Sequence, residues 1–314
     1  MPFGFDPLEM NWSIGIDIGG TAIKSVAAKQ DGTILKRIAQ PTNDGENSTN
    51  EWTQNARQII ADFEKEVGSS EASVGISSPG LAANDERCIA YLPGKLKGLQ
   101  GLDWTDALKK DSLVPVLNDA HAALLGEAWI GAARDKQNVV LLTLGTGVGG
   151  AITSGGKLLK GTIGRAGHLG HMCMDIDGPP SICDMPGAVE GMIGNCTVQE
   201  RSNGKYVSTQ DLVDAYKAND PEATTIWLRS IRSLGCAIAS YINIIDPEIV
   251  VLTGGISIVG NTLMDPLMTV LDEVEWRPGG HKVPVVFGSL GKWAGAIGAA
   301  RLAMNHKASI QAPH

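Results

Sequence analysis

The fold is decided by the stretch GIDIGGTAIK (Gly15–Lys24), because a second glycine turn, LGTGVGG (Leu144–Gly150), repeats its pattern later in the chain. Each turn follows an apolar, β-branched run and precedes another such run, which predicts a strand, a glycine turn and a second strand. The N–H groups that such a turn exposes can hold a phosphate. Two hairpins of this kind, facing each other, predict a clamp for the phosphates of a nucleotide.

Two other interpretations of these turns compete with a nucleotide clamp. Gly145, Gly147 and Gly150 also fit the dinucleotide pattern G-x-G-x-x-G, but that motif opens a helix, and the residues that follow have no helical period. Structural hairpin turns that bind nothing are common as well. Asp17 and Thr21 favour a ligand site, because they place polar groups beside a backbone that glycine lets a ligand approach.

The composition is that of a globular protein with two lobes. The chain has 314 residues, of which 43% are hydrophobic and 19% charged, enough for two sizeable cores. A net charge of −8 leaves no basic face, so we expect no nucleic-acid partner. Five scattered cysteines without a C-x-x-C pair predict reduced thiols and a cytoplasmic location. Without an apolar run of about 18 residues, no membrane span is expected.

The order of the apolar runs predicts a β-β-β-α-β-α scheme that occurs twice, unlike the alternation of a doubly wound sheet. Expected strands are 12–18, 23–28, 33–39, 72–76, 114–117, 138–144, 151–153, 248–252 and 283–286. Expected helices are 52–67, 105–110, 120–133, 188–199, 209–217, 224–244, 257–271 and 293–304. The pair Gly254 and Gly255 is either a surface for a nucleotide base or ribose or a plain strand-to-helix turn. Beside two phosphate turns, the nucleotide is favoured.

Four ordered blocks make the chain resemble the ROK group of sugar kinases within the actin-like ATPase superfamily. They are Asp17–Lys24, LNDA (117–120), Thr143–Gly150, and GHLGHM (167–172) continuing to Glu190. The resemblance implies a duplicated α/β, ribonuclease H-like fold with two lobes around a central cleft. It implies a small lobe of residues 11–120, completed by a C-terminal helix at 293–305, and a large nucleotide-binding lobe of residues 121–292. It also implies a homodimer.

The implied activity is transfer of the γ-phosphoryl group of ATP to a hexose hydroxyl, of glucokinase type at the 6-hydroxyl, with Mg²⁺. N-acetylmannosamine, N-acetylglucosamine, fructose and allose are alternative acceptors, and a non-catalytic sugar or nucleotide sensor is a second class. Some relatives are repressors with a DNA-binding domain ahead of the kinase-like part. Only about ten residues precede the first strand here, so we expect an enzyme.

The family pattern gives Asp119 the role of general base, which takes the proton of the attacking hydroxyl. Its position fits an N-cap of the following helix equally well. Asn118 beside it is expected to bind sugar hydroxyls, since an amide both donates and accepts. Asp17 is expected to hold Mg²⁺ through water. Lys24 either adds charge to this site or lies on a solvated strand face.

The remaining site residues follow from the four blocks and their surroundings. The phosphates and the nucleoside are expected against Asp17, Gly19, Gly20, Thr21, Lys24, Thr143, Gly145, Thr146, Gly147, Gly254 and Gly255. The sugar is expected against Gly80, Asn118, Asp119, His168, His171 and Glu190.

The chain departs from the family in the GHLGHM segment. His168 stands where relatives usually carry a sugar-binding glutamate, so recognition near the anomeric end is altered. The family's zinc site uses one histidine and three cysteines, and these positions are His171, Ser181, Cys183 and Ala188 here. One thiol and one imidazole cannot complete a tetrahedral site, so we expect no zinc. His171 is then free to bond a sugar hydroxyl, unless it is a satisfied core histidine.

Overall fold

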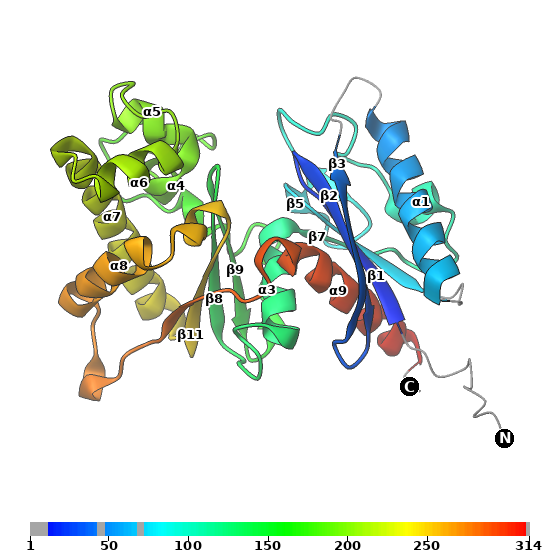
Figure 1. Cartoon of the computed structure of the whole chain (residues 1–314). Coiled ribbons are helices and arrows are strands. Elements are labelled where there is room, and N and C mark those ends of the chain that lie inside the picture. Colours follow the sequence, from blue (N-terminus) through cyan, green and yellow to red (C-terminus); the bar gives the residue numbers. More distant parts are fainter. Residues whose placement is uncertain (1–11, 43–47, 68–71, 312–314) are drawn as a thin grey trace. The chain divides into compact units, whose positions relative to one another are not determined.

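The computed structural model describes residues 12–42, 48–67 and 72–311, and they form two compact units (Figure 1). The first unit takes its described residues from Met1–Asp135, Lys160–Ala166 and Lys292–His314, and the second from Lys136–Leu159 and Gly167–Gly291. Each unit contains one five-stranded sheet. Within these residues, no helix has both the length and the apolar character that a bilayer span requires.

The first unit has its sheet in the order β3-β2-β1-β4-β7, with β1, β2 and β3 antiparallel and β4 and β7 parallel to β1. Its strands are β1 (Trp12–Ile18), β2 (Ala22–Lys29), β3 (Ile34–Pro41), β4 (Ser73–Ser78) and β7 (Val116–Asn118), with a short pair β5 (Leu81–Ala82) and β6 (Ile89–Tyr91). Its helices are α1 (Ser48–Val67), α2 (Trp104–Leu108), α3 (Asp119–Ile130) and α9 (Ala294–Gln311), the last preceded by the 3₁₀ turn η6 (Gly291–Trp293).

The second unit repeats this scheme in the order β10-β9-β8-β11-β12. Its strands are β8 (Val139–Leu144), β9 (Val148–Ser154), β10 (Lys157–Leu158), β11 (Ile249–Thr253) and β12 (Val285–Phe287). Its helices are α4 (Val189–Ile193), α5 (Val198–Arg201), α6 (Thr209–Lys217), α7 (Pro221–Ile245) and α8 (Asn261–Val274), with 3₁₀ turns η2 (Leu169–His171), η3 (Asn195–Thr197), η4 (Gly255–Val259) and η5 (Pro278–Gly280). The matching strand orders confirm the duplicated α/β fold.

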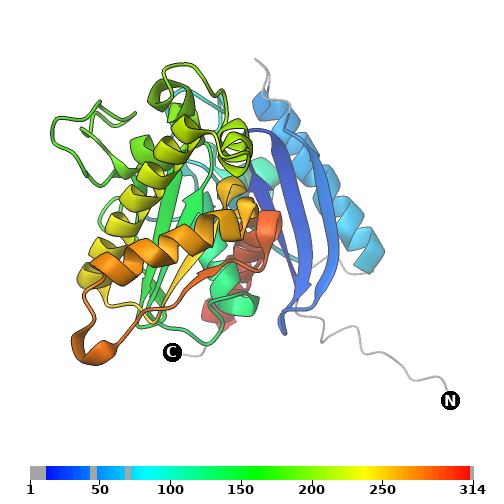
Figure 2. The same ribbon diagram turned by 60° about the vertical axis from the view of Figure 1, so that its left-hand side comes forward.

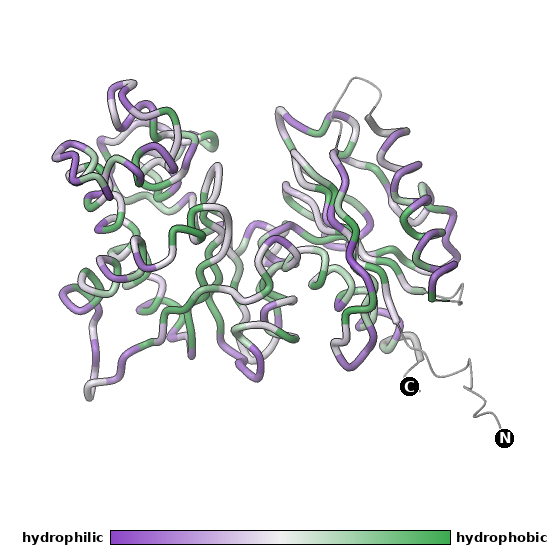
Figure 3. The backbone as a smooth tube through the Cα atoms, viewed as in Figure 1, coloured by the Kyte–Doolittle hydropathy of each residue, from purple (hydrophilic) through white to green (hydrophobic). Residues whose placement is uncertain are grey.

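Burial follows the expected patterning in both units. All seven residues of β1 and all five of β11 are buried, as central strands covered on both faces should be. The strands are largely green in Figure 3, whereas α1 alternates between green and purple, as a helix with one buried side does. In the second unit, α7 and α8 pack together in front of the sheet in the view of Figure 2. Asp220 accepts hydrogen bonds from the first turn of α7 and caps it.

Helix α9 approaches the first sheet so closely that only glycine fits beneath it. A Cβ added at Gly15 on β1 would lie 1.8 Å from the carbonyl oxygen of Ala296, and one at Gly75 on β4 would lie 2.2 Å from that of Ala299. On the other side of the helix, a Cβ at Gly298 would lie 1.6 Å from the carbonyl oxygen of Ala122 on α3. In Figure 1, α9 (red) lies between α3 and β1. The helix therefore joins β1, β4 and α3 into one body.

The first compact unit extends beyond the small lobe that the sequence analysis outlined. It includes α3, which packs against α9, and the segment Lys160–Ala166, although both follow residue 120. Helix α9 runs to Gln311, past the expected end at residue 305. The assignment of a small lobe and a nucleotide-binding lobe stays a prediction.

We predict that Gly15→Ala lowers the free energy of unfolding by about 2 kcal/mol or more, because its methyl group overlaps the backbone of α9. Gly20→Ala is the matched control, since no atom lies within 4 Å of the added Cβ. Urea unfolding of both variants measures the difference. Equal stabilities would show that α9 does not need this close approach.

Candidate functional site

In the first unit, polar side chains gather at the carboxyl ends of the parallel strands β1, β4 and β7. Asp17 is paired with Ser77 in the β1–β4 register, and Ser78 is paired with Asn118 in the β4–β7 register. The Asp17 carboxylate accepts hydrogen bonds from Ser77 Oγ at 2.8 Å and from Lys24 Nζ at 3.1 Å. This edge is where open α/β sheets bind ligands.

Asp17 is 7% exposed, and its burial raises the pKa of its carboxyl group. The charge of Lys24 and the hydrogen bond from Ser77 oppose this rise in pKa, whereas the charge of Asp119 adds to it. The first turn of α9 lies directly on the carboxylate, since a Cβ at Gly295 would be 3.0 Å from Asp17 Cγ. Lys24 therefore belongs to this cluster and does not lie on a solvated strand face.

The residues fit a Mg²⁺ ion held through water. Each oxygen of Asp17 has one of the two protein donors just described, and a carboxylate oxygen can accept a second bond. Hard cations take oxygen ligands, and Mg²⁺ keeps much of its hydration. Asp17 can thus hold a hydrated ion without leaving Ser77 or Lys24.

The first glycine turn is held from outside by Thr42. Its Oγ1 donates to the carbonyl oxygen of Gly19 at 2.6 Å, and its N–H donates to that of Thr21 at 3.1 Å. Gly20 and Thr21 are exposed, and no atom lies within 4 Å of a Cβ added at Gly20. A ligand can therefore reach the backbone at the tip of this turn.

Asn118, and not Asp119, caps helix α3. Asn118 Oδ1 accepts from the N–H groups of Ala120 at 2.9 Å and His121 at 3.3 Å, while its Nδ2 donates to the carbonyl oxygen of Gly80 at 2.9 Å. Asp119 occupies the first helical position and is exposed, with Oδ1 2.8 Å from the N–H of Ala120. The capping role proposed as an alternative for Asp119 thus falls on its neighbour. Asn118 keeps one amide N–H for a ligand.

In the second unit, the second glycine turn is fixed by backbone bonds from η3. The N–H groups of Asn195 and Cys196 donate to the carbonyl oxygens of Gly145 at 3.0 Å and Thr146 at 2.8 Å. No atom lies within 4 Å of a Cβ added at Gly145. This turn, like the first, has a braced backbone and an open glycine.

Gly254 and Gly255 follow β11 at the edge of the second sheet where β8 ends and the second glycine turn begins. Thr253 pairs with Thr143 in the parallel β8–β11 register, so Thr143 and the two glycines are neighbours. Gly254 has a φ of +94°, and its Cβ would lie 2.4 Å from the carbonyl oxygen of Leu144, so only glycine fits there. Nothing lies within 4 Å of a Cβ at Gly255, which leaves its surface open to a ligand.

Glu190 lies against the second turn. Its Oε2 accepts from the N–H of Val148 at 3.1 Å, and a Cβ added at Gly147 would be 1.9 Å from the same oxygen. Turn η2 packs on β9 from another side, because a Cβ at Gly170 would be 1.9 Å from the carbonyl oxygen of Val148. The structure thus brings Glu190 to the second glycine turn and the GHLGHM segment to the strand that follows it.

The rings of His168 and His171 are stacked, with their centroids 6.3 Å apart. His171 Nε2 lies 3.6 Å from Cys183 Sγ. Its Nδ1 is buried and has no hydrogen-bond partner among the described residues. A buried nitrogen without a partner is costly, so His171 has an unmet requirement that a ligand hydroxyl can satisfy.

The loop between His171 and Ala188 does not fit the zinc ion of the family. At the four ligand positions of the family the donors are one imidazole and one thiol, because Ser181 and Ala188 supply no strong zinc ligand, and a structural site needs four N or S ligands. In residues 12–42, 48–67 and 72–311, no three His, Cys, Asp or Glu side chains are grouped to hold a metal. The N–H of Gly187 donates to the carbonyl oxygen of Pro179 and helps to close the loop.

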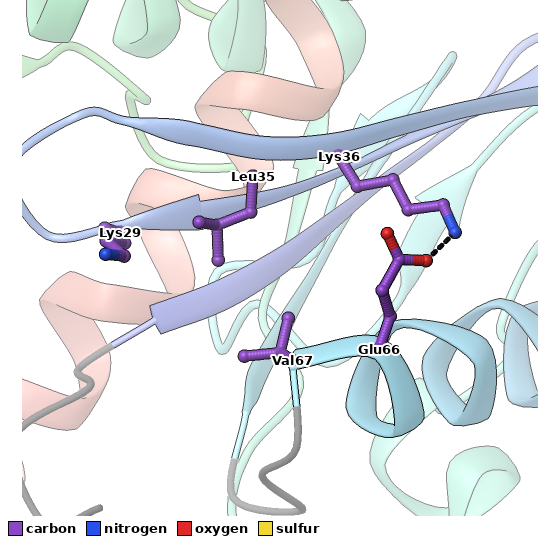
Figure 4. A pocket seen from close by; sticks show the side chains of 5 residues that line it. All are labelled: Lys29, Leu35, Lys36, Glu66 and Val67. Carbon is purple, nitrogen blue, oxygen red and sulfur yellow. Dashed lines mark hydrogen bonds and ion pairs between the residues drawn. The ribbon is translucent and has the colours of Figure 1, made fainter. Parts of the chain in front are cut away.

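A cavity of about 260 Å³ lies elsewhere on the first unit, between the β2–β3 hairpin and the end of α1 (Figure 4). It is lined by Lys29, Leu35, Lys36, Glu66 and Val67, and Lys36 forms an ion pair with Glu66. Lys29 is paired with Trp12 at the start of β1, at the opposite end from Asp17. No predicted site residue lines this cavity.

Three residues at these sites were not predicted from the sequence. Ser77 bonds Asp17, Gly295 admits the helix end beside Asp17, and the buried His121 follows Asp119 on α3. The two hydroxyls Ser77 and Ser78 at the end of a buried strand, followed by Pro79 and Gly80, are the signal in the sequence that points to this position. The close approach of α9 leaves no local signal in the sequence.

Comparison with known proteins places these sites in context. The family model described as "ROK family" matches residues 13–306. A glucokinase of Thermotoga maritima is 32% identical over 92% of this chain and 96% of its own length. An N-acetylmannosamine kinase of Vibrio cholerae is 32% identical over 78% of this chain and 84% of its own. A crystal structure of a ROK family glucokinase from Streptomyces griseus, in complex with glucose and AMPPNP, superimposes with a TM-score of 0.76 at 26% identity, covering 94% of this chain and 99% of that one.

We predict that substitution of the two glycines of the second turn affects different properties: ATP affinity at Gly145 and stability at Gly147. Gly145→Ala should leave stability unchanged within about 0.5 kcal/mol but weaken ATP binding about tenfold, because the new methyl group occupies the surface that a phosphate needs. Gly147→Ala should cost about 1–3 kcal/mol of stability, because it displaces Glu190. Calorimetry of ATP binding and urea unfolding measure both. ATP binding to Gly145→Ala at wild-type strength would exclude a phosphate at this turn.

We predict that Asp17→Asn stabilises the protein free of nucleotide and metal at high pH. A raised pKa in the folded state means that wild-type stability is lost as the pH rises through that pKa, and asparagine avoids this loss. The melting temperature of the variant should therefore exceed that of wild type by a few degrees at pH 8 and approach it near pH 4. The same titration of Asp111→Asn, an exposed carboxylate, serves as the control. A gain in melting temperature that does not vary with pH would contradict ionisation of the buried Asp17 carboxyl group as its cause.

Proposed function

The chain belongs to the ROK family, and from this premise we propose that it is an ATP-dependent sugar kinase that transfers the γ-phosphoryl group to a hexose hydroxyl. One observation supports the proposal most: Asn118 caps α3, which leaves the Asp119 carboxylate exposed in the same unit as Asp17. Asp119 is also near enough for its charge to raise the pKa of Asp17. An exposed carboxylate that can accept the hydroxyl proton, near a carboxylate that can hold Mg²⁺, is the arrangement that phosphoryl transfer to an alcohol requires.

In the proposed reaction, Asp119 accepts the proton of the attacking hydroxyl as the phosphoryl group moves to its oxygen. Asp17 holds hydrated Mg²⁺, which neutralises phosphate charge when bound. The first turn, through Gly19, Gly20 and Thr21, binds the outer phosphates, with Lys24 adding positive charge. The second turn binds them through Gly145, Thr146 and Gly147 next to Thr143, while Gly254 and Gly255 face the nucleoside.

For the sugar, we propose a glucokinase-type acceptor phosphorylated at the 6-hydroxyl. The remaining N–H of Asn118 and the unpartnered Nδ1 of His171 support binding of hydroxyl groups. Gly80, Glu190 and His168 complete the proposed sugar contacts. A neutral imidazole at His168 offers one donor and one acceptor in place of a carboxylate's acceptors. N-acetylmannosamine, N-acetylglucosamine and fructose therefore stay as alternative acceptors, the first supported by the Vibrio cholerae relative.

A non-catalytic sugar or nucleotide sensor is the second candidate, favoured by His168 and by the incomplete zinc ligand set. The open glycines and the exposed Asp119 favour the kinase. The proposal includes a cytoplasmic location, which the scattered single cysteines support, and a homodimer, which the resemblance to the sugar kinases implies. A coupled ADP-release assay across hexoses, N-acetylhexosamines and ketohexoses separates the candidates. A sensor binds ATP or sugar and releases no ADP with any of them.

We predict that Asp119→Asn lowers kcat about 10²–10⁴-fold, because it removes the proton acceptor. ATP affinity should change less than about twofold, since Asn118 still caps the helix. Coupled ADP release and calorimetry measure the two quantities, with Asp111→Asn as the control for loss of an exposed carboxylate. Wild-type turnover by Asp119→Asn would show that Asp119 is not the proton acceptor.

A further inference from the structure

A short segment of the first unit leads directly into the predicted sugar-binding loop. We name Lys160–Ala166 the strap: it follows β10 along the chain, belongs to the first compact unit, and ends where the GHLGHM segment begins at Gly167. It has no regular secondary structure. Within the strap, the N–H of Ala166 donates to the carbonyl oxygen of Lys160 at 3.1 Å, and side chains and close packing hold the strap to the rest of the unit.

Two polar interactions and one close approach hold the strap to β5 and to the loop that follows it. Asn84 Nδ2 donates to the carbonyl oxygen of Thr162 at 2.5 Å, and Lys160 forms an ion pair with the buried Glu86. Gly164 has a φ of +78°, and its Cβ would lie 2.6 Å from the carbonyl oxygen of Ala82. The strap thus lies in backbone contact with β5.

The end of the strap is held by His121 on the first turn of α3. Its side chain is buried, with the residue only 1% exposed, and ring Nε2 lies 3.0 Å from the carbonyl oxygen of Ala166. A carbonyl oxygen only accepts, so Nε2 carries the proton and donates. His121 is two residues after Asp119, and its own N–H donates to the capping Asn118. One helical turn therefore carries both the proposed base and the group that holds Ala166.

The bond at Ala166 also orients the residue that follows. The carbonyl of Ala166 and the N–H of Gly167 belong to one planar peptide unit, so fixing the oxygen fixes the plane from which Gly167 continues. Gly167 has a φ of +85°, which glycine adopts without strain. The first free rotation after the bond to His121 is thus at Gly167, immediately before His168.

We propose that His121 is a positioning residue for the sugar: in the first unit it holds the carbonyl of Ala166, the residue from which the chain continues into the segment that carries His168 and His171. This inference rests on the proposed function, because it assumes that this segment binds the acceptor. His121 touches neither the sugar nor the phosphates in this role. Its loss leaves the carbonyl of the half-buried Ala166 without this donor, so that Ala166 is held by the hydrogen bond from its N–H to the Lys160 carbonyl.

Calorimetric sugar binding and steady-state kinetics test the proposal. His121→Ala should raise the Kd and KM for the sugar about tenfold and leave the KM for ATP within about twofold. His121→Gln, whose side-chain amide can donate from a similar distance, should restore the sugar affinity to within about threefold of wild type. Asn84→Ala releases the strap at Thr162 and should shift sugar affinity in the same direction. Thr162→Ala is the control, because the bond from Asn84 uses the Thr162 carbonyl and not its side chain.

The outcomes separate this inference from the proposed function. Wild-type protein that binds sugar without turnover overturns the kinase but leaves the sugar Kd of each variant as the readout. A wild-type sugar Kd in His121→Ala overturns the inference, as does an equal rise in the KM for sugar and ATP together with a lower melting temperature. Failure of His121→Gln to recover sugar affinity, while Asn84→Ala behaves as wild type, overturns it as well.

Discussion

The structure of the first unit depends on the backbone contact between α9 and the strands beneath it. Gly15 and Gly75 are paired in the β1–β4 register, and both lie under the helix, so these two strands and α9 approach more closely than any side chain allows. Ser13 Oγ donates to the carbonyl oxygen of Ala300 at 2.8 Å and fixes the helix along its axis. The same helix brings its first turn onto Asp17 and its opposite side onto α3, which begins at Asp119. Two candidate site carboxylates therefore depend on one packing constraint.

The two units share one arrangement at their candidate sites: some polar groups hold the backbone through hydrogen bonds, and neighbouring residues stay exposed, where a ligand can reach them. Thr42 braces the first turn and η3 braces the second, while Gly20 and Gly145 stay open. Asn118 caps α3, and Asp119 is left exposed. In the proposed kinase, this division offers the triphosphate open glycines on turns that protein hydrogen bonds already hold.

Much of the fold was predictable, because local signals agreed with tertiary packing. Strand 12–18 and helix 209–217 were predicted with the bounds that the structure has, since a buried apolar run and a serine cap define them. The helix expected at 188–199 is broken, because Gly194 and η3 turn aside to pair with the second glycine turn, a distant contact. Lys24 was ambiguous until the hairpin register placed it opposite Asp17. The cap of α3 was ambiguous because Asn118 and Asp119 both suit it, and His121 and Gly295 were missed because their partners are far away in sequence.

The central claim is that this chain moves a phosphoryl group from ATP to a sugar hydroxyl. Its most direct test is mass spectrometry of the products formed from ATP labelled with ¹⁸O in the γ-phosphoryl group, with Mg²⁺ and an accepted hexose or N-acetylhexosamine. We predict a sugar monophosphate that carries the three labelled non-bridging oxygens, formed by wild type and about 10²–10⁴-fold more slowly by Asp119→Asn. Labelled inorganic phosphate without any sugar phosphate would contradict it.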